Sequence, residues 1–135
     1  MITAIDTSVL VDVLINDPQC AEKSKSAMRK AATDGALVLC ESTLAEIVPV
    51  LSAGEIAEFL SDWNLKFIPS SQESAILAGE MFRAYLKRGG KRGRVVSDFL
   101  IAAHAQIHAE RLLARDRGYY RDYFKRLKLW DPADN

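Results

Sequence analysis

The chain has 135 residues, a formal net charge of zero and 49% hydrophobic residues, which is typical of one globular domain with a substantial core. No apolar run is long enough to span a bilayer, and Asp6 and Asp12 interrupt the apolar N-terminal stretch, so neither membrane association nor a signal peptide is expected. Cys20 and Cys40 are the two cysteines, and they lack CxxC spacing. These properties predict a cytoplasmic protein with reduced thiols.

Apolar runs alternate with amphipathic stretches along the chain. The runs predict short buried strands at residues 2–5, 36–40, 65–68, 111–115 and 127–129. The stretches between them predict helices at residues 9–15, 21–33, 52–63, 69–86 and 95–108, and a further helix that follows Glu41-Ser42-Thr43 and runs through Val48. This alternation predicts an α/β fold, a three-layer α/β/α sandwich whose central, mainly parallel sheet has four or five short strands. We expect a single domain over residues 1–135.

Four acidic residues fall on one predicted edge of this sheet. Asp6 ends the first strand, and Glu46 lies in the first turn of the helix after the second strand. Asp98 opens the helix at 95–108, and Asp116 follows the fourth strand. Strand carboxyl ends and helix amino ends meet at the same edge, where ligands bind. Converging carboxylates repel each other unless a cation joins them, and oxygen ligands suit Mg²⁺ or Mn²⁺.

Each acid also has a purely structural explanation. Thr43 and Glu46 have the spacing of a helix capping box, Asp98 is a favourable acid for a first helical turn, and Asp116 stands in a turn-like sequence. Asp6 is the hardest to explain in this way, because a carboxylate at the end of a buried strand is costly without a partner.

Four short motifs carry a resemblance that covers essentially the whole chain. They are Ile-Asp-Thr-Ser-Val-Leu at 5–10, Thr-Leu-Ala-Glu-Ile at 43–47, Ser-Asp-Phe-Leu-Ile-Ala-Ala-His-Ala at 97–105 and Leu-Leu-Ala-Arg-Asp-Arg-Gly-Tyr-Tyr at 112–120. In this order they resemble PIN-domain proteins of the VapC type, which are small ribonuclease toxins of type II toxin–antitoxin pairs. One departure is Ala114, where relatives often have Thr or Ser.

The resemblance implies a PIN-like sandwich and a metal-dependent endoribonuclease. The four acids would be both catalytic residues and ligands of Mg²⁺, with Mn²⁺ as a substitute, and RNA hydrolysis would leave a 5′-phosphate and a 3′-hydroxyl. The implied partners are an RNA substrate and an antitoxin protein, in a homodimer or in a heterotetramer or hetero-octamer with the antitoxin. The alternative is a catalytically inactive RNA-binding module on the same fold. A phosphoaspartyl enzyme or receiver domain fits less well, since Ser8 stands where a second Asp is usual.

Basic residues are concentrated towards the C-terminus, where residues 87–128 hold two thirds of the 18 Lys and Arg residues. We interpret residues 87–94 as a loop that binds the phosphates of the RNA backbone through Lys91, Arg92 and Arg94, with Arg117 on the same surface. A solvated loop without a partner is the alternative. Arg115 and Arg121 are further candidates for this surface, and Tyr119 or Tyr120 is available for base stacking or for the core.

Several residues near these motifs receive simpler interpretations. Thr7 is expected to hydrogen-bond a ligand carboxylate or a phosphate, whereas Ser8 is expected to cap the first helix. Asp12 is interpreted as a surface or helix-face residue. His104 and His108 have the spacing of a zinc pair but lack its other features, so a structural or exposed role is expected. An apolar helical stripe is assigned to the core, with a dimer or antitoxin contact left open, and it comprises Ile56, Phe59, Leu60 and Trp63.

Overall fold

A computed structural model describes residues 1–93, 95–115 and 118–134. Its strands are β1 (Ile2–Ile5), β2 (Ala36–Leu39), β3 (Leu65–Phe67), β4 (Arg111–Leu113) and β5 (Leu129–Trp130). Its helices are α1 (Thr7–Leu14), α2 (Ala21–Asp34), α3 (Glu41–Ile47), α4 (Glu55–Asp62), α5 (Gln72–Lys87), α6 (Val95–His108) and α7 (Tyr119–Tyr123), with 3-10 helices η1 (Val48–Val50) and η2 (Pro132–Asp134). The α/β sandwich expected from the sequence is confirmed.

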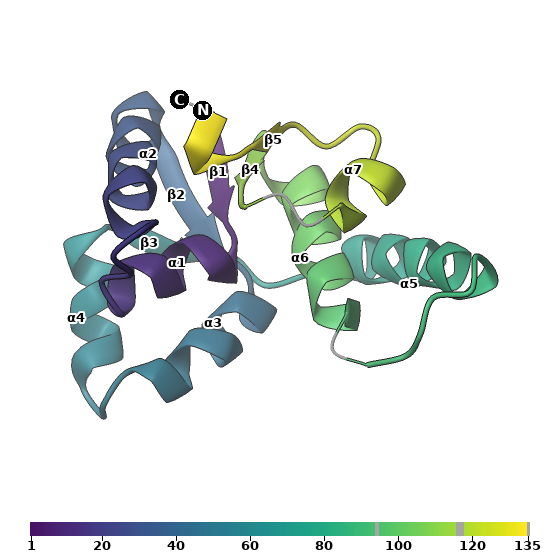
Figure 1. The fold of residues 1–135 in the computed structure, drawn as a ribbon, viewed down its shortest axis with the longest axis horizontal. Coiled ribbons are helices and arrows are strands. Elements are labelled where there is room, and N and C mark those ends of the chain that lie inside the picture. The colour runs from purple at the N-terminus through teal and green to yellow at the C-terminus, as the bar shows by residue number, and fades with distance from the viewer. Residues whose placement is uncertain (94, 116–117, 135) are drawn as a thin grey trace.

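The five strands form one parallel sheet in the order β3-β2-β1-β4-β5, with β1 at its centre (Figure 1). The chain moves outwards from β1 through β2 to β3 and then returns to the other side of β1 with β4. The strand order therefore reverses between β1 and β4. In parallel sheets such a reversal opens a crevice at the carboxyl ends of the strands, which is where ligands bind.

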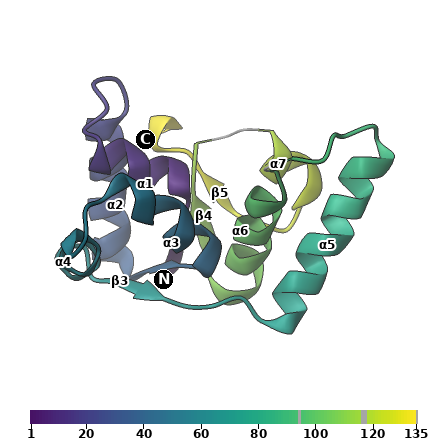
Figure 2. The same ribbon diagram turned by 90° about the horizontal axis from the view of Figure 1, so that it is seen from below.

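The two faces of the sheet carry two separate cores, because successive residues of a strand point to opposite sides. In β1, Ala4 packs with α5, α6 and α7, whereas Ile5 packs with α1, α2 and α3. In β4, Leu112 and Leu113 divide in the same way. Figure 2 shows the resulting arrangement, with α5 outside α6 and far from the helices of the other face. Both cores meet at β1 and hold it fixed.

The boundaries of some elements differ from the expected ones. The second strand ends at Leu39, so that Cys40 is the N-cap of α3 and this helix begins at Glu41. Helix α4 begins only after Gly54, whose φ of 89° lies in the left-handed region that favours glycine. Helix α7 was not expected. In the described part of the chain, no helix combines the length and the apolar character needed to cross a membrane.

Candidate functional site

Asp6 lies where the central strand β1 passes into α1, and it is 1% exposed. It is itself the N-cap of α1: Oδ2 accepts hydrogen bonds from the Ser8 amide at 3.0 Å and from the Ser8 hydroxyl. Oδ1 accepts a hydrogen bond from the Tyr120 hydroxyl at 2.7 Å. The expectation that Ser8 caps the helix is therefore wrong, because Ser8 lies inside the helix and orients the carboxylate that caps it.

A second buried aspartate in the same helix shows what is unusual about Asp6. Asp12 is 1% exposed, and its Oδ1 lies 3.0 Å from Nη2 of Arg115, while Ser24 donates to its Oδ2 at 2.9 Å. Asp12 therefore lies on a face of α1 but not at the surface, and the Arg115 guanidinium offsets the cost of its burial. Asp6 contacts only neutral donors within the described residues, so its charge is left without a counter-ion from them.

Thr7 joins the first motif to the second. Its hydroxyl donates a hydrogen bond to Oε1 of Glu46 at 2.7 Å, and this contact links the start of α1 to α3. Glu46 is exposed and lies near the end of α3, so its expected position in the first turn is wrong. The capping box with Thr43 is absent for the same reason: Thr43 is buried in the first turn, and its hydroxyl contacts the Cys40 thiol at 3.8 Å.

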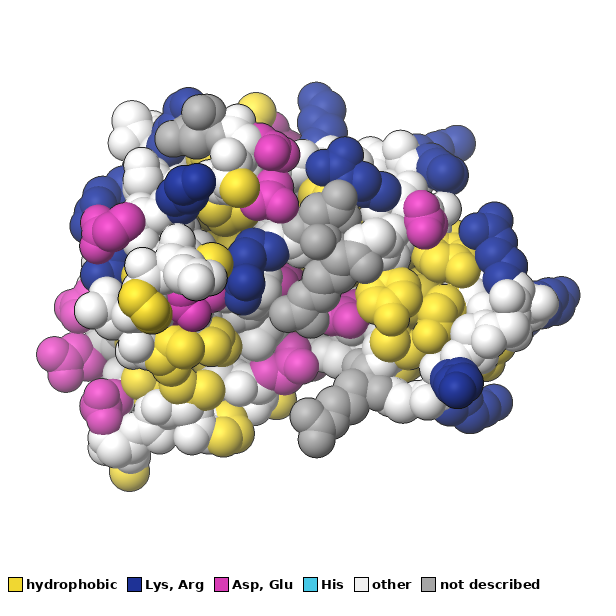
Figure 3. Space-filling view, in the orientation of Figure 1, with side chains coloured by type: hydrophobic (Ala, Val, Ile, Leu, Met, Phe, Trp, Pro, Cys, Tyr) yellow, Lys and Arg dark blue, Asp and Glu magenta, His cyan; other side chains and the backbone are white. Residues whose placement is uncertain are grey.

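Asp98 lies in the first turn of α6, as expected, and is half-buried. Because α6 runs back to the start of β4, its amino end lies at the same edge of the sheet as Asp6. Helices α3 and α6 are in contact, and acidic side chains show between them on the surface in Figure 3. Asp116, the fourth predicted acid, lies outside the described residues. Among the residues that are described, no three His, Cys, Asp or Glu side chains form a group that could hold a metal ion.

The loop between α5 and α6 places Lys91 and Arg92 on the surface, while Arg94 and Arg117 fall outside the described residues. Its start is anchored to a cluster of aromatic rings. The Gly90 amide donates to the Tyr85 carbonyl at 3.0 Å, and the Arg88 guanidinium stacks over the Tyr123 ring at 5.0 Å. In Figure 3, Lys and Arg side chains gather at this end of the molecule.

The structure decides between the alternatives left open for the tyrosines after β4, and it gives the arginine Arg115 an acidic partner. Tyr120 is 1% exposed, so its ring belongs to the core. Tyr119 packs edge-on against Tyr85 at 5.6 Å. Arg115 pairs with Asp12. Sequence reasoning missed these contacts to Asp6 and Asp12, although the spacing of Asp12 four residues after the buried Ser8 places both on one helical face.

A partly buried group of polar residues from α3, α5 and α6 and from the segment that leads into α5 includes both histidines. Burial lowers the pKa of His104, which is 1% exposed. His108 Nε2 lies 3.1 Å from the Ser71 hydroxyl at the start of α5. Burial acts to raise the pKa of Glu41, but hydrogen bonds from the amide and hydroxyl of Ser70, both 2.8 Å long, outweigh it and lower that pKa. The expected structural role of the two histidines agrees with these contacts.

Comparisons with known proteins define the family. A family model for the PIN domain matches residues 3–125. The chain therefore belongs to the PIN-domain family, and its α/β sandwich is a PIN fold. No curated protein matches the sequence significantly.

Three solved structures share this fold over nearly the whole chain. One is VapBC2 from Rickettsia felis bound to a DNA fragment from its promoter, with 22% identity, a TM-score of 0.74 and coverage of 97% of this chain and 98% of that one. Another is FitAcB from Neisseria gonorrhoeae, with 20% identity, a TM-score of 0.69 and complete coverage, 100%, of both chains. A third is VapBC-1 from nontypeable Haemophilus influenzae, with 18% identity, a TM-score of 0.72 and coverage of 98% and 99%.

Proposed function

We propose that this protein is a Mg²⁺-dependent endoribonuclease and the toxin of a type II toxin–antitoxin pair, acting in the cytoplasm as one PIN domain over residues 1–135. One observation carries the catalytic part of the proposal. Asp6 is buried at the strand-order reversal and, among the described residues, is held only by neutral donors, whereas Asp12, six residues away, forms an ion pair with Arg115. A buried carboxylate left in this state favours a cation from outside the protein.

The donor set fits Mg²⁺ or Mn²⁺. Asp6 presents oxygen atoms, which these hard cations prefer. Its Oδ2 accepts two hydrogen bonds from Ser8, whereas Oδ1 accepts one from Tyr120 and keeps a second lone pair for a cation. Asp98 lies at the amino end of the 14-residue helix α6, whose dipole favours the ionised carboxylate. We assign Asp6, Asp98, Glu46 and Asp116 as the residues that hold the ion.

Different residues of the chain have different roles in the proposed RNA hydrolysis. A bound ion supplies Lewis-acid polarisation of the scissile phosphate and of the attacking water. Ser8 and Tyr120 keep the Asp6 carboxylate in one orientation, and Thr7 does the same for Glu46. Lys91 and Arg92, together with Arg94 and Arg117, bind the RNA backbone without reading its sequence. The products of this hydrolysis would be a 5′-phosphate and a 3′-hydroxyl.

An antitoxin partner is proposed from the neighbours and from an apolar surface. The neighbouring structures are VapBC and FitAB complexes. Val48 and Val50 of η1 are 47% and 40% exposed beside α4, whose apolar stripe packs on the core and is only half-buried. Leu51, the residue after η1, lines a cavity of about 230 Å³ together with Leu14, Phe59 and the acids Glu55, Glu58 and Asp62. A basic amphipathic helix fits this surface. We propose a homodimer, or a heterotetramer or hetero-octamer with the antitoxin.

Cleavage of a structured RNA tests the catalytic proposal. Wild-type protein is expected to cut with Mg²⁺, to stop with EDTA, and to lose activity in Asp6→Asn and Asp98→Asn while still binding RNA. If both variants cut normally, the assignment is wrong. RNA binding that requires Lys91 and Arg92, without metal-dependent cleavage, would instead identify the inactive RNA-binding module.

Co-expression with the product of the adjacent reading frame tests the antitoxin proposal. A stable complex that inhibits cleavage, and that Val48→Asp weakens, is the expected result. If a small DNA-binding neighbour is absent, a stand-alone nuclease becomes the better description.

A further inference from the structure

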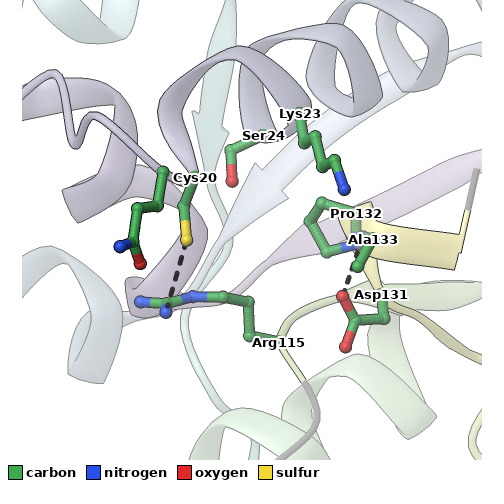
Figure 4. Close-up of a pocket in the computed structure, with 8 residues that line it drawn as sticks. Cys20, Lys23, Ser24, Arg115, Asp131, Pro132 and Ala133 are labelled. Atoms are coloured by element: carbon green, nitrogen blue, oxygen red, sulfur yellow. Dashed lines mark hydrogen bonds between the residues drawn. The ribbon is translucent and has the colours of Figure 1, made fainter.

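Arg115 lies just beyond β4, and its side chain crosses to the helices on one face of the sheet. Nη2 lies 3.0 Å from Oδ1 of Asp12. Nη1 lies 3.8 Å from the Cys20 sulfur, a contact that Figure 4 shows. The Asp12 carboxylate is 2% exposed and also accepts a hydrogen bond from Ser24 of α2 at 2.9 Å. This ion pair therefore fastens the chain that leaves β4 to α1 and α2.

The backbone of the same residue reaches the candidate metal site. The Arg115 amide donates to the Ser8 hydroxyl at 3.4 Å, and this hydroxyl donates its own proton to Oδ2 of Asp6. The amide of the preceding Ala114 is fixed by the Trp130 carbonyl at 3.0 Å. A path of contacts thus runs from Asp12 through Arg115 and Ser8 to Asp6. If Arg115 moved, its amide would no longer donate a hydrogen bond to the Ser8 hydroxyl oxygen. The Ser8 hydroxyl could then rotate away from Asp6.

We propose that Asp12 and Arg115 are positioning residues, whose ion pair holds the Arg115 backbone where it directs the Ser8 hydroxyl at Asp6. The inference rests on the proposed metal site, of which it names a support. A partly buried ion pair stabilises a fold only weakly, because desolvation offsets most of the attraction, but it fixes geometry. Its removal is therefore expected to change the metal affinity of Asp6 beyond any effect on stability.

Manganese binding, followed by electron paramagnetic resonance, is the direct test, since it needs no turnover. Asp12→Asn and Arg115→Met are each expected to weaken Mn²⁺ binding by about tenfold, the low end of what residues behind metal ligands contribute. The double variant is expected to lose no more than either single variant, because both remove one ion pair. Arg115→Lys, which keeps the charge, is expected to recover part of the affinity.

A second ion pair at the other end of the same strand supplies the control. Arg111 Nη2 lies 2.9 Å from Oδ2 of Asp34, with side-chain exposures of 18% and 43%. Arg111→Met and Asp34→Asn are expected to lower the melting temperature while Mn²⁺ affinity stays unchanged. Asp6→Asn is expected to abolish Mn²⁺ binding. If it does, two results would overturn this inference without affecting the proposed metal site: an equal loss of Mn²⁺ affinity in the Arg111 and Asp34 variants, or no loss of affinity in the Asp12 and Arg115 variants. A wild-type protein that binds no Mn²⁺ would overturn the proposed function as well.

Discussion

The Tyr120 hydroxyl donates a hydrogen bond to Oδ1 of Asp6 over 2.7 Å, although 114 residues separate the two in sequence. Both residues are 1% exposed, so water does not compete for this contact. A phenol donates without carrying charge, and it therefore orients the carboxylate but does not neutralise it. The contact fixes α7 against the end of the central strand and holds the Asp6 carboxylate in one orientation.

Tyr120→Phe removes this hydroxyl and keeps the ring in the core. We expect the free energy of unfolding to fall by about 1.5–3 kcal/mol, which is typical of a hydrogen bond to a charged group. We also expect kcat/KM for RNA cleavage to fall about tenfold, equivalent to roughly 1.4 kcal/mol. Urea denaturation and initial-rate measurements test the two effects. Tyr123→Phe, on the same short helix, is the control, and unchanged cleavage in Tyr120→Phe would exclude a role in orienting Asp6.

Thr7→Val removes the hydrogen bond to Glu46 while keeping a branched side chain. Because Glu46 is exposed, the expected loss of stability is small, about 0.5–1 kcal/mol. Cleavage is expected to fall more than stability does, since the freed carboxylate no longer points in one direction. Thr7→Ser retains the hydroxyl and should behave like the wild-type protein. Equal cleavage by the Val and Ser variants would show that the contact has no catalytic importance.

Two glycines of α5 and its following loop allow a matched comparison. A Cβ at Gly90 would lie 2.5 Å from the Tyr85 ring, whereas one at Gly79 would meet nothing within 4 Å. Gly90→Ala is expected to displace the basic loop and weaken RNA binding at low salt, measured by fluorescence anisotropy. Gly79→Ala lies inside the helix and should raise stability by about 0.5–1 kcal/mol without changing RNA binding. Normal RNA binding by Gly90→Ala would place the RNA elsewhere.

His104 makes stability dependent on pH. Burial lowers its pKa below the usual value of 6.5, and the nearby His108 lowers it further, whereas the Ile68 backbone and Glu41 act in the opposite direction. The unfolded chain therefore takes up a proton near pH 6.5 that the folded chain resists, so stability is complete above that pH and decreases as the pH falls. The slope from this residue is at most about 1.4 kcal/mol per pH unit.

Denaturation at pH 7.5 and at pH 5.5 measures this effect. His104→Gln is expected to lose less stability between these two pH values than the wild-type protein loses, whatever its stability at pH 7.5. His108→Gln leaves the buried imidazole of His104 in place and should keep most of the pH dependence of stability. Parallel pH profiles for wild type and His104→Gln would contradict the assignment.

The sequence by itself determined the PIN-type α/β sandwich and the structural positions of two residues of the proposed site. Short apolar runs form β1 and β2 close to the predicted residues, because burial on both faces of a parallel sheet leaves a local, unbroken apolar pattern. Asp6 and Asp98 were placed correctly at a strand end and in a first helical turn, since these positions depend on neighbours within a few residues. The α7 helix, at five residues, was too short to leave such a pattern.

Only the tertiary structure decided which buried carboxylate forms an ion pair within the protein. Asp12 and Asp6 look alike in the sequence, yet Arg115 reaches one, while Ser8 and Tyr120 hold the other. The parallel pairing of β1 with β4 brings these distant segments together, so no local pattern records the outcome. The position of Glu46 followed from a helix that begins at Glu41, a boundary that the end of β2 sets. Charge and periodicity are local properties, whereas the partner of a buried carboxylate depends on the packing of the whole chain.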